Sequence, residues 1–402
     1  MLKGKMSLEG KTAINRRQFQ YPKLWTPNFI FICLVSLCNA MAFQGLNVSL
    51  PVYIDKLGGS PSLAGLAMGT LTAAAVIIRP FVGWALDRYG RKFIFLMGLL
   101  LFLLPSVVYV FMVPFSILLM MRFIQGFGWG ISHTTAGTVA SDIVPPLRMG
   151  EGMGTFNVTG SISSALAPLM ILWIINQFSF SSAFVVISLL SVTSIIFSQA
   201  LRYPKFAPPT SKSKMELFSR DGLQPALVIL LIGTAQGTIF SFVALFARGR
   251  GISNPGLFFA LMGITAIFSR PLTGKLLDRL GQRGFDLTVI ISVPLMTLTL
   301  WIVSLTDASW YLAVGGALYG IGYGMIQSSM MVMLINMLPG KRGLANAMYG
   351  TCLDTGVAFG AILWGVVANL VGYQAMFRWA TIPILLCLFV YFFRKPVCQM
   401  KI

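Results

Sequence analysis

The side chains of this sequence that could take part in chemistry are polar and charged groups within strongly apolar segments. One set consists of Arg122, Gln125, Trp129 and His133. Their spacing of i, i+3, i+7 and i+11 places them within about 80° on one face of an α-helix. A guanidinium in apolar surroundings needs a partner or water. Arg122 could therefore tune the proton affinity of a nearby carboxylate, bind an anionic group of a ligand, or serve as a hydrogen-bonded structural residue.

Two titratable residues are candidates for carrying a proton. Asp354 lies near the middle of an apolar segment and is the leading candidate, although a hydrogen-bonded carboxyl packed against a neighbouring helix fits the same position. His133 could titrate near neutral pH, but a lone histidine on a helix is more commonly a satisfied hydrogen-bonding group. A single histidine and five cysteines without a CxxC pair predict no metal site.

A charged motif occurs twice in the chain, at a constant offset of 191 residues. Both copies begin with Arg-Pro, at Arg79 and at Arg270, and a match at six fixed positions indicates an internal repeat. The residues of the motif that we expect to act in gating are Gly83, Asp87, Arg88, Gly90, Arg91 and Lys92 in the first copy, and Gly274, Asp278, Arg279 and Gly281 in the second.

Long apolar helices must position these residues. Apolar residues make up 56% of the chain and only 11 residues are acidic. A run of about 20 apolar residues crosses a ~30 Å hydrocarbon core as a helix. The sequence predicts about twelve such spans, at 29–52, 62–86, 93–113, 115–140, 151–175, 182–201, 223–246, 256–277, 286–305, 310–337, 344–370 and 374–393.

The distribution of positive charge predicts the orientation of these spans. With alternating spans and a cytoplasmic N-terminus, 23 of the 30 lysines and arginines fall on the cytoplasmic side. This asymmetry is the positive-inside rule, so we expect both termini in the cytoplasm of a cell membrane. The net charge of +19 is then explained by topology and by an anionic inner leaflet, and it predicts no nucleic-acid partner.

The chain is expected to divide into two similar halves. We predict a basic tail at 1–28, a six-helix bundle at 29–201, a cytoplasmic linker at 202–222, a second six-helix bundle at 223–394 and a short tail at 395–402. The second half lacks a counterpart of Arg122, because the equivalent position 316 is glycine. We predict that aromatic and amide side chains form a wall of the substrate site, namely Asn39, Trp129, Gln236, Phe240, Tyr319, Tyr323 and Gln327. The alternative is that these side chains only pack between helices.

Two signatures carry a family resemblance. The segment from Gly83 to Lys92, Gly-x-x-x-Asp-Arg-x-Gly-Arg-Lys, matches the loop signature of the major facilitator superfamily, and Arg122-x-x-Gln125-Gly-x-Gly matches its fourth-span signature. The chain resembles this family over nearly its whole length, and within it the twelve-helix drug:proton antiporter and efflux branch. Residues 163–168 depart from that branch, which usually has Gly-x-x-x-Gly-Pro there. The resemblance implies two bundles that rock around a midplane cavity.

The repeated aspartates suggest how the two halves could be held together. Asp87 is expected beside the start of the eleventh span, where a carboxylate would be stabilised by the helix N-terminus, and Asp278 beside the start of the fifth. Glu151 lies at that second site, so its repulsion would need compensation by Arg148 or Arg279. The alternative is that both aspartates only fold a tight loop and fix topology.

Together these features predict an all-α membrane protein that acts as a monomeric secondary active transporter. We expect proton-coupled export of a small organic molecule, such as a drug-like compound, a sugar or a metal-chelating metabolite. A proton symporter for uptake and a uniporter are alternatives, and a membrane enzyme, receptor or scaffold is a more remote one. No Ser/His/Asp set or nucleotide-binding loop is present in the sequence, so we predict neither enzyme activity nor a cofactor.

Overall fold

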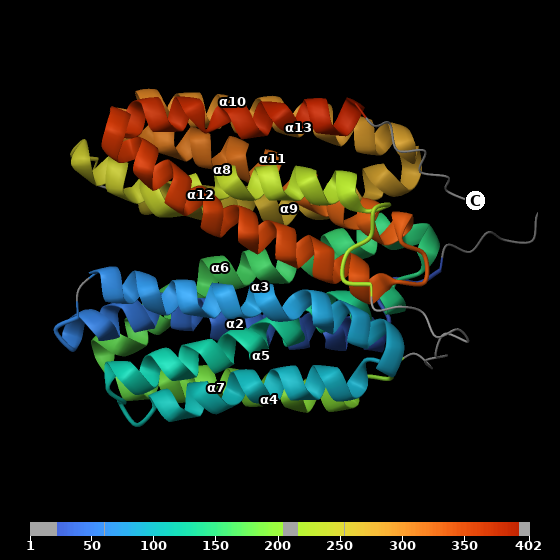
Figure 1. The fold of residues 1–402 in the computed structure, drawn as a ribbon, viewed down its shortest axis with the longest axis horizontal. Coiled ribbons are helices and arrows are strands. Elements are labelled where there is room, and N and C mark those ends of the chain that lie inside the picture. Colours follow the sequence, from blue (N-terminus) through green and yellow to red (C-terminus); the bar gives the residue numbers. More distant parts are fainter. Residues whose placement is uncertain (1–21, 60, 204–215, 253, 394–402) are drawn as a thin grey trace, which may run out of the picture.

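The computed structural model describes residues 22–59, 61–203, 216–252 and 254–393. These residues form long α-helices arranged as two bundles (Figure 1). The first bundle contains α2 (Pro27–Lys56), α3 (Pro61–Tyr89), α4 (Lys92–Tyr109), α5 (Phe115–Ile143), α6 (Met149–Gln177) and α7 (Phe180–Ala200). The second contains α8 (Leu223–Gly249), α9 (Gly256–Leu280), α10 (Gln282–Leu305), α11 (Ser309–Met337), α12 (Arg342–Trp379) and α13 (Thr381–Phe393).

The prediction of an all-α membrane protein with twelve helices is confirmed. Within the described ranges, eleven segments are long and apolar enough to cross a membrane. The last of them, Arg342–Phe393, has 52 residues and comprises α12 and α13, so it is long enough for two passes. It is interrupted at Gly372, whose φ of 82° and ψ of 163° lie outside the helical region. A positive φ of this kind suits glycine, and the break falls between the predicted spans at 344–370 and 374–393.

Parts of the predicted tails and linker lie outside the described residues, namely 1–21, 204–215 and 394–402. Where the N-terminal segment is described, α2 begins at Pro27, slightly earlier than the predicted span. Thr26 caps the helix, since its hydroxyl accepts a hydrogen bond from the backbone N–H of Phe29 at 3.2 Å.

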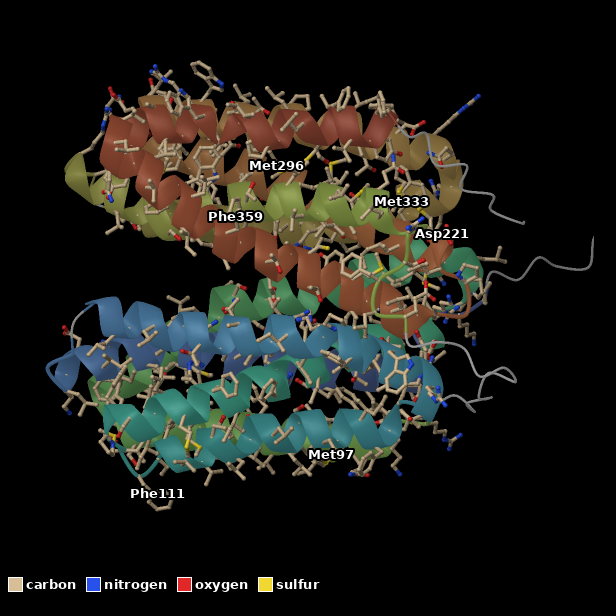
Figure 2. The ribbon with its side chains drawn as sticks, in the orientation of Figure 1. Met97, Phe111, Asp221, Met296, Met333 and Phe359 are labelled. Carbon is tan, nitrogen blue, oxygen red and sulfur yellow. The ribbon has the colours of Figure 1, made fainter. Side chains whose placement is uncertain are left out.

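The interior of each bundle is built by close packing of apolar side chains and glycines. Met296 and Met333 are fully buried in the second bundle, whereas Met97 on α4 is 41% exposed (Figure 2). The Gly-x-Gly-x-Gly segment of α5 packs against neighbouring backbones. A Cβ at Gly126 would lie 2.4 Å from the carbonyl oxygen of Leu71 on α3. Small residues allow such approach in membrane helices, so this segment positions the polar face that α5 carries.

The two bundles meet most closely at one end. We call it the contact end, where α3 and α9 finish and α6 and α12 begin, and we call the other the far end. In Figure 1 the bundles come together at the contact end, on the right, and their ribbons diverge toward the far end. The repeated charged motif lies at the contact end in both bundles.

Candidate functional site

Asp87, at the end of α3, binds the first turn of α12 in the other bundle. The backbone N–H of Gly343 donates to its Oδ1 at 2.8 Å, and that of Leu344 donates to its Oδ2 at 2.9 Å. These N–H groups have no partner within their own helix. A carboxylate at a helix N-terminus typically contributes about 0.3–2 kcal/mol. Gly83 permits this approach, because a Cβ there would lie 2.9 Å from the carbonyl oxygen of Gly343.

Asp278 makes the equivalent contact in the second copy of the motif. Its Oδ1 accepts from Gly150 N–H at 2.7 Å and its Oδ2 from Glu151 N–H at 2.8 Å. The negative charge of Glu151 is compensated by Arg148, at 2.6 Å, and by Lys275, at 3.7 Å. The sequence suggested Arg148 or Arg279 for this purpose, and the structure uses Arg148 together with Lys275.

Asp142, at the end of α5, was not identified from the sequence, yet it also joins the bundles. It accepts from Arg91 Nε at 2.8 Å and from Arg342 Nη1 at 3.3 Å, so it links α4 to α12. The signal available in the sequence was an aspartate at the end of an apolar span, on the same predicted side of the membrane as the motif arginines. Arg91 also lies 3.9 Å from Asp87, which places both aspartates in one charged network.

The remaining motif residues lie around this network. Gly90 and Gly281 adopt positive φ values of 92° and 55° at the turns after α3 and α9. The Arg88 guanidinium lies 5.6 Å from the ring of Trp84, a cation–π distance. Lys92 and Arg279 are exposed at the same end of the molecule.

Arg79 and Asp354 form an ion pair between the bundles. Arg79 Nη2 on α3 lies 2.8 Å from Asp354 Oδ2 on α12, and the two side chains are 2% and 26% exposed. Arg79 thus finds a carboxylate in the opposite bundle. The pair depends on a glycine, because a Cβ at Gly350 would lie 1.7 Å from Arg79 Nη1. The Asp354 side chain therefore points toward α3. Its helix, α12, also packs against α8.

Arg270 occupies the position equivalent to Arg79 but has neutral partners. Its Nη1 donates to the carbonyl oxygen of Asn157 on α6 at 2.8 Å, and its Nη2 donates to Gln327 Oε1 at 2.9 Å. No carboxylate pairs with Arg270 among the described residues. Both halves therefore have a buried arginine at this position, but among the described residues only Arg79 has a carboxylate as its partner.

Arg122 is fully buried among neutral groups of the first bundle. Its Nη1 donates to Gln125 Oε1 at 3.0 Å, and its Nη2 lies 3.2 Å from Asn47 Oδ1 and 3.0 Å from Met68 Sδ. The predicted polar face of α5 therefore meets α2 and α3. Gln125 is held in turn by Ser106, whose hydroxyl accepts from its Nε2 at 3.1 Å.

The aromatic part of the same face also packs against α2. The Trp129 ring stacks on Phe43 with 3.8 Å between centroids and 6° between planes, and it lies 4.8 Å from the His133 ring. Asn39 donates to Ser132 Oγ at 3.0 Å. Asn39, Trp129 and His133 are thus neighbours in the first bundle.

The predicted wall residues of the second bundle form a separate, buried cluster. The Tyr323 hydroxyl donates to Gln236 Oε1 and accepts from Gln327 Nε2. Tyr319 and Tyr323 stack with 5.7 Å between ring centroids. Phe240 differs, because it is 49% exposed and its ring stacks on Phe259. The structure therefore places this cluster beside Arg270, through Gln327.

Comparisons with known proteins give a consistent result. The profile of the Major Facilitator Superfamily matches residues 32–287 and 284–400. The chain is 21% identical over 384 residues to the staphylopine export protein of Staphylococcus aureus (strain Mu50), covering 92% of this chain and 96% of that protein. It is 24% identical over 379 residues to the multidrug resistance protein MdtG of Citrobacter koseri, covering 89% and 92%. Among solved structures, it superimposes on the human organic anion transporter MFSD10 with a TM-score of 0.74 and 17% identity, over 90% of this chain and 98% of that one, a likeness of fold.

Proposed function

We propose that this protein, which belongs to the major facilitator superfamily, exports a small organic molecule in exchange for protons. Membership of that family makes it a multi-pass membrane transporter of a small-molecule substrate. The direction is supported by one relative that is named as an export protein, for staphylopine, and by another, MdtG, that is named as a multidrug resistance protein. A drug-like compound, a sugar and a metal-chelating metabolite remain the candidate substrate classes.

The contact end is proposed to face the cytoplasm. The lysines and arginines of the repeated motif gather there, which is the side favoured for positive charge in membrane proteins. In this orientation, the cross-bundle contacts of Asp87 and Asp278 close the cytoplasmic side. The structure then corresponds to a state whose substrate path is shut toward the cytoplasm.

The Arg79–Asp354 ion pair is the single observation that supports proton coupling most directly. It joins the two bundles inside the apolar region, and its carboxylate remains 26% exposed. A proton that reached Asp354 would remove the negative charge and leave Arg79 unpaired. An unpaired buried charge is strongly unfavourable, so the bundles would separate at the contact end, where water can solvate the arginine.

This arrangement yields exchange rather than simple leakage. Protonated Asp354 favours an open contact end, at which a cytoplasmic substrate enters and the proton leaves. Deprotonated Asp354 pairs with Arg79 again, which closes that end behind the substrate. A proton and a substrate thus move in opposite directions during one cycle. Asp87 and Asp278 accept backbone hydrogen bonds from the other bundle, and these contacts add to the stability of the closed state.

The test is proton movement in proteoliposomes that contain the purified protein. An imposed pH gradient should collapse faster when a substrate is added from a panel of drugs, sugars and metal-chelating metabolites. Asp354→Asn should abolish this substrate-dependent flux. The matched control is Asp307→Asn, an exposed acid in the loop before α11, which should leave the flux intact.

Other outcomes would assign a different function. Substrate movement without proton flux would indicate uniport or another coupling ion. Proton and substrate movement in the same direction would indicate uptake by symport. Normal proton exchange in Asp354→Asn would refute the role proposed for this carboxylate.

A further inference from the structure

The apolar interior of the protein holds more positive than negative charge. Three arginines there are at most 9% exposed, namely Arg79, Arg122 and Arg270. Among the described residues, one carboxylate forms an ion pair with these arginines, namely Asp354 with Arg79. Each buried charge without a counter-ion is costly, so a protein that keeps such groups must gain something from them.

The three arginines differ in what their guanidinium groups already do. Arg79 is neutralised by Asp354, and Arg270 crosses between the bundles to reach a backbone carbonyl on α6. Arg122 does neither, because all of its partners are neutral side chains of its own bundle. The Nε of each of the three arginines is buried without a hydrogen-bond partner, so they differ in the partners of their Nη groups. Arg122 is therefore the arginine with unused capacity to bind an anion.

The surroundings of Arg122 supply no paired carboxylate among the described residues for the alternative role of tuning an acid. That role needs an acid within ion-pair distance of the guanidinium. Within the described part of the chain, no carboxylate forms an ion pair with Arg122. The amide oxygens of Gln125 and Asn47 orient the group while leaving its charge intact.

A chain of polar side chains connects Arg122 to the surface of the first bundle. Asn47 donates to Gln44 Oε1 at 3.2 Å, and Gln44 donates to Ser164 Oγ on α6. Asn47 and Gln44 are partly exposed and Ser164 is exposed. A ligand that entered beside α2 and α6 would thus meet amides and a hydroxyl before it met the guanidinium.

An aromatic platform lies along the same helices. Phe43 follows Ala42 on α2 and directly precedes Gln44, and its ring stacks on Trp129. Trp129 is seven residues after Arg122, which corresponds to about 10 Å along an α-helix. The spacing suits a ligand with an anionic head at Arg122 and an apolar or aromatic body that extends toward the Phe43–Trp129 pair.

We propose that Arg122 binds the anionic group of the transported molecule, held in place by Gln125 and Asn47, so that the substrate is a small organic anion. The inference rests on the proposed transport function and narrows its substrate class. Neutral sugars and cationic drugs are excluded by it, whereas carboxylate-bearing compounds are favoured. Bidentate hydrogen bonding between a guanidinium and a carboxylate supplies the recognition.

The test uses sets of three compounds that share one scaffold and differ in charge. Aromatic and aliphatic scaffolds each carry a carboxylate, a primary amide or a primary amine, and binding to the purified protein is measured by calorimetry. We expect binding to be confined to carboxylates. Arg122→Gln should weaken it by about 10- to 100-fold, as expected for loss of charged hydrogen bonds. Arg122→Lys keeps the charge and should retain the preference for carboxylates with lower affinity.

Controls separate a loss of binding from a loss of folding. Arg283→Gln removes an exposed arginine at the start of α10 and should bind carboxylates as the wild type does. Helical circular dichroism and a single gel-filtration peak show whether each variant is folded. If Arg122→Gln fails this check, the comparison of Arg122→Lys with wild type decides.

The outcomes for the inference and for the transport function are distinguishable. Equal or tighter binding of amides or amines, unchanged carboxylate binding in Arg122→Gln, or no binding of any carboxylate overturns the inference. If an amide or amine nevertheless drives proton flux in wild-type proteoliposomes, transport stands and only the anion assignment fails. If no compound of any charge drives flux, the proposed function fails with it.

Discussion

Replacing Asp354 by asparagine should open the contact end of the protein. The substitution keeps the size of the side chain but removes the charge that pairs with Arg79 at 2.8 Å. Removing one partner of a buried ion pair costs about 3–5 kcal/mol. Since the Asp354 side chain is 26% exposed, we take the lower value, ~3 kcal/mol. The pair joins the two bundles, so this cost falls on the closed arrangement and not on either bundle alone.

A cost of ~3 kcal/mol changes the ratio of closed to open molecules roughly 100-fold. The shift can be measured as a distance distribution between two spin labels on a background that lacks the five native cysteines. Suitable sites are Phe93 on α4 and Leu280 on α9, which are exposed and lie at the contact end in different bundles. The wild type should give mainly a short distance, and Asp354→Asn mainly a longer one.

The double variant Arg79→Gln/Asp354→Asn provides the internal control. It removes both charges, so no buried charge is left unpaired, and most molecules should return to the short distance. Non-additivity of this kind is what a direct interaction produces. An unchanged distance in folded Asp354→Asn, or a double variant as open as the single one, would refute the reasoning.

Three further predictions concern the same contacts. Asp87→Asn keeps an oxygen acceptor but loses the charge at the start of α12, so the population with the longer spin-label distance should rise by a smaller factor, about 2- to 30-fold. Gly350→Ala should lengthen it as well, by displacing the paired guanidinium, whereas Gly69→Ala, whose Cβ would meet nothing within 4 Å, should not. Gln327→Leu should lower the melting temperature in detergent, because it leaves a buried hydroxyl and a guanidinium nitrogen short of a partner at a cost of about 1–3 kcal/mol, and exposed Gln177→Leu at the end of α6 should not.

The fold was largely predictable from the sequence because a lipid bilayer imposes a strong pattern. Each span must be long, apolar and helical, so the twelve helices follow from composition alone. The internal repeat added the two-bundle arrangement. The break at Gly372 could be located only approximately, since the hydropathy of the last two spans is nearly continuous.

Contacts between distant segments were harder to predict. The position of Asp87 opposite the start of α12 followed from the alternation of spans, and the structure shows the two hydrogen bonds. The pairing of Arg79 with Asp354 did not follow, because helix rotation decides which residue faces the other bundle. Asp142 was missed for the same reason, since its two arginine partners are separated from it by 51 and 200 residues.

The clustering of residues on one helix was easier to predict than the partners of that cluster. The polar face of α5 is set by a periodicity of 3.6 residues. Whether it meets a cavity or another helix depends on packing, and here Asn47 and Phe43 of α2 cover it. Phe240 shows that helical periodicity alone can mislead. The periodicity predicted that it would join Gln236 in the substrate wall, but its ring stacks on Phe259.

The glycines at the contact end have a consequence for how the protein changes shape. Gly83 meets Gly343, and Gly150 meets Gly274, so backbone touches backbone at two places with no long side chain between them. Such contacts have little compliance, because there is no flexible side chain to stretch before they part. Both are formed by the same two rigid bodies at the same end, so a rotation that breaks one breaks the other. The transition should therefore be cooperative and switch-like, with few molecules held half open.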